Sequence, residues 1–159
     1  SGLSTRRFAF EAFLPPDKKE RKAILEELKS ETRTIILYEA PHHLVGTLEE
    51  LYETLGNRRM TLCRELTKKH ETAFCSTIKD LLDFYQDQKP LGECVLVIEG
   101  KSREEIREEE KAAWEEMSIS QHMEVYEKQG IARKEAMKLV AKDRGVTKRE
   151  IYQALLEIK

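Results

Sequence analysis

The chain has 159 residues, 36% of them charged and 40% hydrophobic, and its formal net charge is −2. This length allows one domain with a sizeable core, or one domain with a small appendage. The sequence has neither a run of roughly 18 apolar residues nor a signal-peptide pattern, so we expect a soluble protein without a membrane span. Cys63, Cys75 and Cys94 are odd in number and widely spaced, which favours reduced thiols in a cytoplasmic protein over disulfides or a zinc site.

Charge is unevenly distributed along the chain. Residues 100–130 carry a net charge of −4, and residues 131–159 carry a net charge of +4. An acidic middle therefore precedes a basic tail. Such an asymmetry predicts a binding partner for the tail.

The first half of the chain alternates between strand and helix patterns. Residues 8–14 alternate apolar with small or polar side chains, which predicts a strand. Residues 18–29 place their apolar side chains on one face of a helix. Residues 35–38 are an apolar, β-rich run that predicts a strand buried on both faces of a sheet. Four leucines within residues 44–55 recur at helical spacing, and Gly56 ends that helix.

The pattern continues to about residue 100. Residues 59–66 predict a third strand, and residues 70–75 predict a short further one. Thr77, with Asp80 three residues later, is typical of the start of a helix. Residues 92–100 predict a buried strand. We therefore expect an α/β, mixed-sheet domain of three layers that ends near residue 100.

No strand pattern follows residue 100. Residues 102–117 are densely charged and predict a solvated connecting helix or linker. Ser118 with Gln121, and Thr147 with Glu150, have the spacing of capping boxes at helix starts. The tail is therefore predicted to be a small, all-α unit of three helices. The predicted organisation is an α/β domain, a charged helical linker and a three-helix tail, over residues 1–100, 101–117 and 118–159.

The last two helices of the tail are joined through a short turn at Gly145, with the spacing of a helix-turn-helix. Long cations on the exposed face of the second helix can neutralise phosphates, and an aromatic ring there can stack on a base. A surface helix whose lysines only maintain solubility is the equally weighted alternative, because Glu150 and Glu157 dilute the charge. The candidate RNA-binding residues are Lys148, Arg149, Tyr152 and Gln153.

Candidate ligand-binding and catalytic residues follow the ends of predicted strands. The turn at Glu39 follows a strand and precedes a helix, and ligands bind at such edges of open α/β sheets. Glu65 and Lys68 follow the next strand along the chain, where a surface salt-bridge network is an equally good interpretation. His42 and His43 have no third ligand at metal spacing, so we expect no metal site.

Five ordered motifs extend this interpretation. The motifs are Ser1–Phe8, Phe13–Pro15, Tyr38–His42, Arg64–Lys68 with His70 and Glu71, and Gly92–Ile98. Together they resemble the second half of the 16S ribosomal RNA (cytidine-2′-O)-methyltransferases, which are members of the tetrapyrrole methylase superfamily. The basic tail is similar to the C-terminal extension of those enzymes.

The resemblance implies a two-domain, usually homodimeric enzyme that holds S-adenosylmethionine in the cleft between its domains. It implies that the N-terminal domain is missing here; the chain also begins at Ser1 without a methionine, so we expect a fragment that is inactive alone. By position, the methionine end of the cofactor lies against one loop and its adenosine lies near the start of the last strand. These cofactor-binding residues are Tyr38, Glu39, Ala40 and Pro41 in the loop, and Glu93 and Cys94 at the strand.

On this interpretation the partner is small-subunit ribosomal RNA, and the acceptor is a ribose 2′-hydroxyl. The hydroxyl is a poor nucleophile until its proton leaves. Glu65 is a candidate to accept that proton, and Lys68 is a candidate to stabilise the alkoxide. Two alternatives remain: a non-enzymatic nucleic-acid-binding module with a helix-turn-helix tail, or a tetrapyrrole-type small-molecule methyltransferase.

Overall fold

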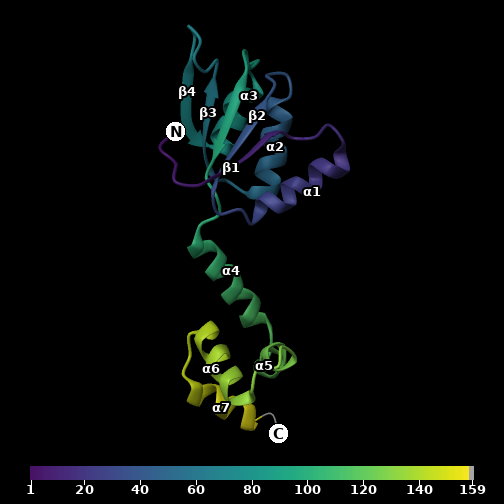
Figure 1. Cartoon of the computed structure of the whole chain (residues 1–159), viewed down its shortest axis with the longest axis vertical. Coiled ribbons are helices and arrows are strands. Elements are labelled where there is room, and N and C mark those ends of the chain that lie inside the picture. Colours follow the sequence, from purple (N-terminus) through teal and green to yellow (C-terminus); the bar gives the residue numbers. More distant parts are fainter. Residues whose placement is uncertain (158–159) are drawn as a thin grey trace. The chain divides into compact units, whose positions relative to one another are not determined.

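The computed structural model describes residues 1–157, and side chains as far as Leu156. The chain divides into two compact units, Ser1–Ser102 (unit 1) and Arg103–Lys159 (unit 2). The described residues contain five strands and seven helices (Figure 1). None of these helices is long and apolar enough to cross a membrane.

Unit 1 is an α/β unit built on a five-stranded sheet. Its elements are β1 (Phe8–Phe13), α1 (Lys18–Lys29), β2 (Thr34–Glu39), α2 (Leu44–Leu55), β3 (Arg59–Arg64), β4 (Thr72–Thr77), α3 (Ile78–Gln86) and β5 (Cys94–Ile98). The spatial order of the strands is β1-β2-β5-β3-β4. Only β1 and β2 are parallel, and the other three pairs are antiparallel, which confirms the predicted mixed sheet.

The register of the sheet gathers three distant segments at one edge. Strand β5 runs antiparallel to both of its neighbours, so its first residue faces the last residue of each. Cys94 is paired with Glu39 of β2 and with Arg64 of β3. The two loops that carry the candidate site residues therefore leave the sheet on either side of the start of β5.

The helices of unit 1 share a single hydrophobic core with one face of the sheet. Alternate residues of β2, β3 and β5 contribute to this core, among them Ile35, Leu62 and Leu96, which are fully buried. Helices α1, α2 and α3 all pack into the same cluster, and α2 contributes the predicted leucine stripe. The expectation of three layers is wrong for residues 1–102, because the described helices cover only one face of the sheet.

The opposite face of the sheet is open over β1, β2 and β5. Ile36 and Val95 are half-buried there, and 40% of Tyr38 is exposed. The prediction that residues 35–38 are buried on both faces is therefore wrong, because no described helix of unit 1 covers this side. Over β3 the N-terminal segment lies against the sheet, and the Thr61 hydroxyl donates to the carbonyl of Ser1 at 3.1 Å.

Two strand boundaries differ from the prediction. Strand β3 ends at Arg64 rather than at residue 66, because Glu65 adopts a positive φ of 51° that turns the chain out of the sheet. Strand β4 begins at Thr72 and extends to Thr77, where the Thr77 side chain caps α3 as predicted.

Unit 2 consists of α4 (Arg103–Glu116), α5 (Ile119–Lys128), α6 (Arg133–Arg144) and α7 (Lys148–Glu157). Its small core contains Met123, Ala136, Val140, Ala141 and Ile151. Both predicted capping boxes are confirmed. Ser118 and Gln121 exchange side-chain and backbone hydrogen bonds at the start of α5, and Thr147 and Glu150 do so at the start of α7.

An aromatic stack attaches α4 to α5. The ring of Trp114 lies parallel to that of the buried His122, with 3.9 Å between the centroids. His122 Nδ1 accepts a hydrogen bond from Arg144 Nε at 3.1 Å. His122 Nε2 is 3.3 Å from a carboxylate oxygen of Asp143, without hydrogen-bond geometry. That carboxylate also accepts a 2.5 Å hydrogen bond from Tyr126, which raises the pKa of Tyr126 to about 12.

Candidate functional site

A cleft of about 880 Å³ opens in unit 1 where β2 ends and β5 begins. All six residues predicted to hold a cofactor line it, namely Tyr38, Glu39, Ala40, Pro41, Glu93 and Cys94. They come from two segments more than fifty residues apart, which the antiparallel pairing of β2 with β5 brings together. Cofactor binding by these residues stays a prediction, and the structure shows that they share one cavity.

Aromatic side chains of β1 form a wall of this cleft, although they were not predicted from the sequence. The ring of Tyr38 makes edge contacts with Phe10 and Phe13, at centroid distances of 5.1 and 5.6 Å. A strand of regular pleat would place residues three apart on opposite faces. A β-bulge with Ala12 at φ 53° shifts the register between Phe10 and Ala12, and it returns Phe13 to the face of Phe10.

The carboxylate of Glu39 is turned into the fold rather than into open solvent. Only 6% of Glu39 is exposed. One oxygen accepts from the backbone N–H of Ala40 at 2.8 Å, and the other accepts from the Thr47 hydroxyl at 2.5 Å. The Arg21 guanidinium lies 3.9 Å away and donates to Thr47 at 2.7 Å. Glu39 thus fixes the turn between β2 and α2 and thereby the position of the cleft wall.

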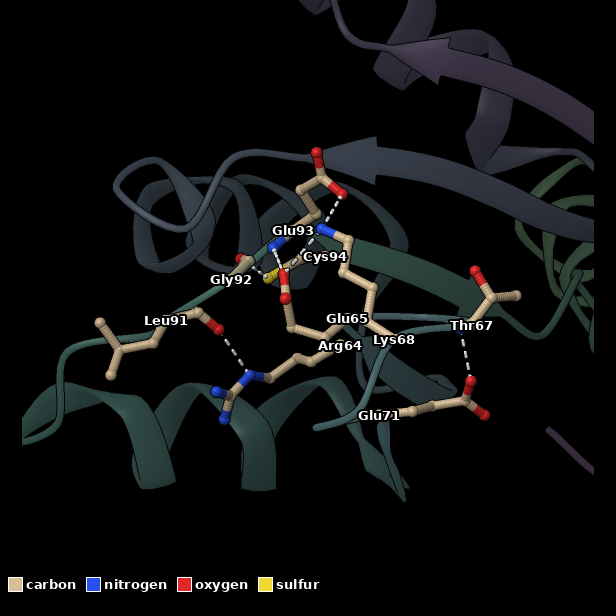
Figure 2. Close-up of polar contacts among 9 residues, drawn as sticks. All are labelled: Arg64, Glu65, Thr67, Lys68, Glu71, Leu91, Gly92, Glu93 and Cys94. Atoms are coloured by element: carbon tan, nitrogen blue, oxygen red, sulfur yellow. Dashed lines mark hydrogen bonds and ion pairs between the residues drawn. The ribbon is translucent and has the colours of Figure 1, made fainter.

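A second polar cluster ties the loop after β3 to the start of β5 (Figure 2). Glu65 accepts a hydrogen bond from the backbone N–H of Glu93 at 2.8 Å, and its own N–H donates to the carbonyl of Glu93 at 3.0 Å. The Lys68 ammonium bridges the carboxylates of Glu93 at 2.7 Å and Glu65 at 3.3 Å. The structure therefore brings the two catalytic candidates together beside Glu93, which lines the cleft, although neither candidate lines it itself.

This loop is held in a strained conformation. Glu65 and Thr67 both have positive φ values, 51° and 64°, which are rare for residues with side chains. The Thr67 N–H donates to the Glu71 carboxylate at 2.6 Å, and Arg64 donates to the carbonyl of Leu91 at 2.8 Å (Figure 2). These contacts compensate the strain and hold Leu66, which lines the cleft.

Gly92 is required where the two loops meet. It has a φ of 80°, and a Cβ at this position would lie 2.6 Å from the Cγ of Glu65. A larger residue would push the Glu65 side chain away from the N–H of Glu93. The close approach of the two loops therefore depends on a glycine.

Charges, hydrogen bonds and burial shift the pKa values of three ionisable groups in or beside the cleft. The hydrogen bond from the Glu93 N–H, together with Lys68, lowers the pKa of Glu65. The Glu93 and Glu65 carboxylates raise the pKa of Lys68. Burial raises the pKa of the Cys94 thiol to about 11, so the thiol is protonated at neutral pH and is a poor nucleophile.

The two histidines after Pro41 lie outside this cluster. Both are exposed, and their rings contact each other with centroids 4.2 Å apart. Among the side chains of residues 1–156, no three of His, Cys, Asp or Glu are arranged to hold a metal ion.

Unit 2 has a cleft of its own between the starts of α6 and α7. Of the four predicted RNA-binding residues, Lys148, Arg149 and Tyr152 line it, whereas Gln153 is exposed on α7 outside it. The remaining lining residues are Arg133, Lys134 and Met137. These three residues were not predicted from the sequence, although the Arg133–Lys134 pair starts α6 as the Lys148–Arg149 pair starts α7.

Comparison with known proteins shows similarity along nearly the whole chain. The protein named ribosomal RNA small subunit methyltransferase I from Bacillus subtilis is 44% identical over 154 residues, which are 97% of this chain and 52% of that protein. The proteins of the same name from Halalkalibacterium halodurans and Synechocystis are 44% and 36% identical, over 96% and 100% of this chain. The chain spans about half the length of these relatives (52%, 52% and 56%). No protein-family model matches it.

Proposed function

We propose that this chain, a homologue of the ribosomal RNA small subunit methyltransferase I proteins over nearly its whole length, is part of an S-adenosylmethionine-dependent methyltransferase. The proposed substrate is small-subunit ribosomal RNA, and the proposed acceptor is the ribose 2′-hydroxyl of a cytidine. The identity of 36–44% to proteins of that name carries the proposal. This identity favours an enzyme that acts on RNA over a non-enzymatic binding module or a methyltransferase that acts on small molecules.

The cleft of unit 1 fits S-adenosylmethionine in size and in chemistry. Its volume of about 880 Å³ lies within the range of roughly 300–1,000 Å³ that is typical of small-molecule sites. The rings of Phe10, Phe13 and Tyr38 offer an aromatic surface to an organic ligand, and aromatic faces attract a cation such as a sulfonium. Glu93, whose exposed carboxylate pairs with Lys68 at 2.7 Å, lines the same cleft.

The proposed reaction requires the site to position a methyl donor and a ribose hydroxyl for a direct methyl transfer. When bound, S-adenosylmethionine supplies a methyl group attached to a positively charged sulfur. The carbon–sulfur bond breaks as the ribose O2′ forms a bond to the methyl carbon, and the hydroxyl proton leaves. Holding the two atoms in line at about 3 Å accounts for several kcal/mol of the barrier in reactions of this type.

Within this scheme Lys68 and Glu65 act on the hydroxyl. The ammonium of Lys68 stabilises the negative charge that develops on O2′. Glu65 has the proposed role of proton acceptor: its carboxylate is ionised at neutral pH, although the Glu93 N–H and Lys68 lower its pKa and make it a weaker base than a free glutamate. We expect Lys68→Ala in the full-length protein to lower the methyl-transfer rate about 100-fold or more with little change in cofactor affinity. Lys69→Ala, at the neighbouring exposed position, is the matched control, and equal rates for both variants would remove Lys68 from the reaction.

The proposal that the chain is part of an rRNA methyltransferase also gives roles to the other parts of the chain. Residues 1–100 are the second domain of a tetrapyrrole methylase fold, residues 101–117 are a linker, and residues 118–159 bind RNA. The complete enzyme contains an N-terminal domain that closes the cofactor cleft, and it works as a homodimer in the cytoplasm.

The proposal is tested by methylation of small-subunit ribosomal RNA with the full-length protein and S-adenosylmethionine, followed by mass spectrometry of the nucleosides. We expect 2′-O-methylcytidine with the full-length protein. We expect none with the 159-residue chain, because half of the proposed cofactor cleft is absent. Full-length protein that leaves every ribose unmethylated would refute the proposal.

A further inference from the structure

The cleft of unit 2 is lined by cations and by apolar or aromatic side chains. Its volume is about 660 Å³, and it lies between the first turns of α6 and α7. The two cations that each helix contributes to the lining are called its rim, and Met137 and Tyr152, which also line it, are called its floor. The lining residues are Arg133, Lys134, Met137, Lys148, Arg149 and Tyr152.

The four cations are placed where they do not stabilise their helices. Arg133 and Lys134 are the first two residues of α6, and Lys148 and Arg149 are the first two of α7. The N-terminal end of a helix carries partial positive charge, so cations there are unfavourable. The same unfavourable arrangement occurs on both helices at the same cleft, which indicates a use other than helix stability.

These cations are also largely free of carboxylate partners. Arg133 lies 3.5 Å from a carboxylate oxygen of Glu127, and the other three form no ion pair with a carboxylate whose position the structure describes. The nearby acids are engaged elsewhere. Glu135 pairs with Lys138 at 2.9 Å, and Glu150 accepts from both the N–H and the hydroxyl of Thr147.

The floor of the cleft has a second property that a simple phosphate site would not need. Tyr152 is 54% exposed, and Met137 is half-buried beside it. The Tyr152 ring thus offers a flat apolar face in the same cleft as the four cations. Nucleobases stack on such faces, whereas free phosphate gains nothing from them.

We propose that this cleft binds a single-stranded RNA segment, with its phosphates on the four cations and one unstacked base on Tyr152. The inference rests on the proposed function, because it takes RNA as the substrate. It goes further by naming the site and the form of the RNA. A duplex hides the faces of its bases, so it can use the cationic rim but not the floor.

The test is fluorescence anisotropy of the 159-residue chain with a labelled single-stranded RNA of about a dozen nucleotides, and with a hairpin of the same composition, at several salt concentrations. We expect Arg133→Ala/Lys134→Ala to weaken binding as much as Lys148→Ala/Arg149→Ala. Each pair should reduce the slope of log affinity against log salt by roughly 0.7 per lost phosphate contact on a single strand.

The floor and the control are tested in the same assay. Tyr152→Ala should weaken binding of the single strand about ten-fold and leave the hairpin nearly unaffected, and Tyr152→Phe should retain binding of both. Lys128→Ala/Lys142→Ala removes two exposed cations, of α5 and α6, that do not line the cleft, and it should match the parent chain.

The outcomes separate this inference from the proposed function. If only the Lys148→Ala/Arg149→Ala variant loses affinity, the tail binds RNA without the cleft, and the inference is overturned while the proposed role of the tail stands. If the control pair weakens binding as much as the cleft pairs, the charge acts diffusely and the inference is likewise overturned. Methylation by the full-length protein is measured independently of all these results.

Discussion

Replacing Glu39 by alanine is expected to destabilise unit 1 by about 3 kcal/mol, because it removes one partner of a buried polar cluster. The substitution abolishes two hydrogen bonds to a carboxylate, from the Ala40 N–H at 2.8 Å and the Thr47 hydroxyl at 2.5 Å. Hydrogen bonds to charged groups contribute about 1.5–3 kcal/mol each, and the desolvation cost of a carboxylate that is only 6% exposed offsets part of that sum. Thr47 keeps its contact with Arg21, so the loss stays below the sum of both bonds.

This loss of stability is measured by native-state hydrogen exchange of the 159-residue chain, at the backbone amides of β2 and α2. A loss of 3 kcal/mol corresponds to roughly a 150-fold fall in protection. Glu39→Gln should cost less, since an amide oxygen can still accept one bond. A double-mutant cycle of Glu39→Ala with Thr47→Val should give a coupling energy of about 1.5 kcal/mol.

The fluorescence of Trp114, the only tryptophan and a residue of unit 2, reports separately whether unit 2 remains folded in these variants. A change in protection below about five-fold, or a coupling energy near zero, would refute the assignment of Glu39 as the residue that fixes this turn.

Two further predictions concern a glycine and a histidine. Gly92→Ala places a side chain at a φ of 80°, and its new Cβ would lie 2.6 Å from the Glu65 Cγ. The melting temperature should therefore fall, and it should fall less when the same change is made in a Glu65→Ala background; equal falls in the two backgrounds would show that the contact is unimportant. Burial lowers the pKa of His122 below its ordinary value of 6.5, so the unfolded chain binds a proton more readily than the folded one. The stability of unit 2 should therefore be complete above pH 6.5 and decline as the pH falls through the lowered pKa; a urea midpoint of Trp114 fluorescence that does not decrease on acidification would contradict this.

Much of the fold was predictable because local chemistry and packing agree. The leucine stripe of α2, the Thr77 cap of α3 and the capping box between Ser118 and Gln121 are confirmed. In each case the sequence signal and the tertiary contact favour the same conformation. The positions of β1 and β2 followed from apolar runs in the same way.

The features that were not predictable depend on contacts between distant segments. The positive φ of Glu65, which ends β3, is maintained by hydrogen bonds to Glu93, which lies 28 residues further along the chain. The bulge at Ala12 has no glycine to indicate it, yet it decides that Phe13 joins Phe10 at the cleft. The apolar composition of β2 predicted burial on both faces, but composition does not say whether a layer of this unit covers the second face.

The candidate site was predicted by two different routes. Strand ends and loop composition indicated Glu39, Glu65 and Lys68, whereas only the resemblance to a family indicated Glu93 and Cys94. The antiparallel pairing of β5 with both β2 and β3 explains why the two routes lead to one cleft. In unit 2 the cations of α7 were predicted from its helix start, but those of α6 became evident only when α6 and α7 were seen to share a cleft.

The most direct test of the account is calorimetric titration of S-adenosylmethionine into the full-length protein with two matched substitutions. Tyr38 lines the cleft and is 40% exposed, and Tyr52 lies on α2 away from it and is 37% exposed. The account predicts that Tyr38→Ala weakens binding about ten-fold or more, through the loss of its aromatic face, while Tyr52→Ala leaves the affinity unchanged. Equal affinities for the two variants would contradict it, because the methyl donor would then bind somewhere other than this cleft.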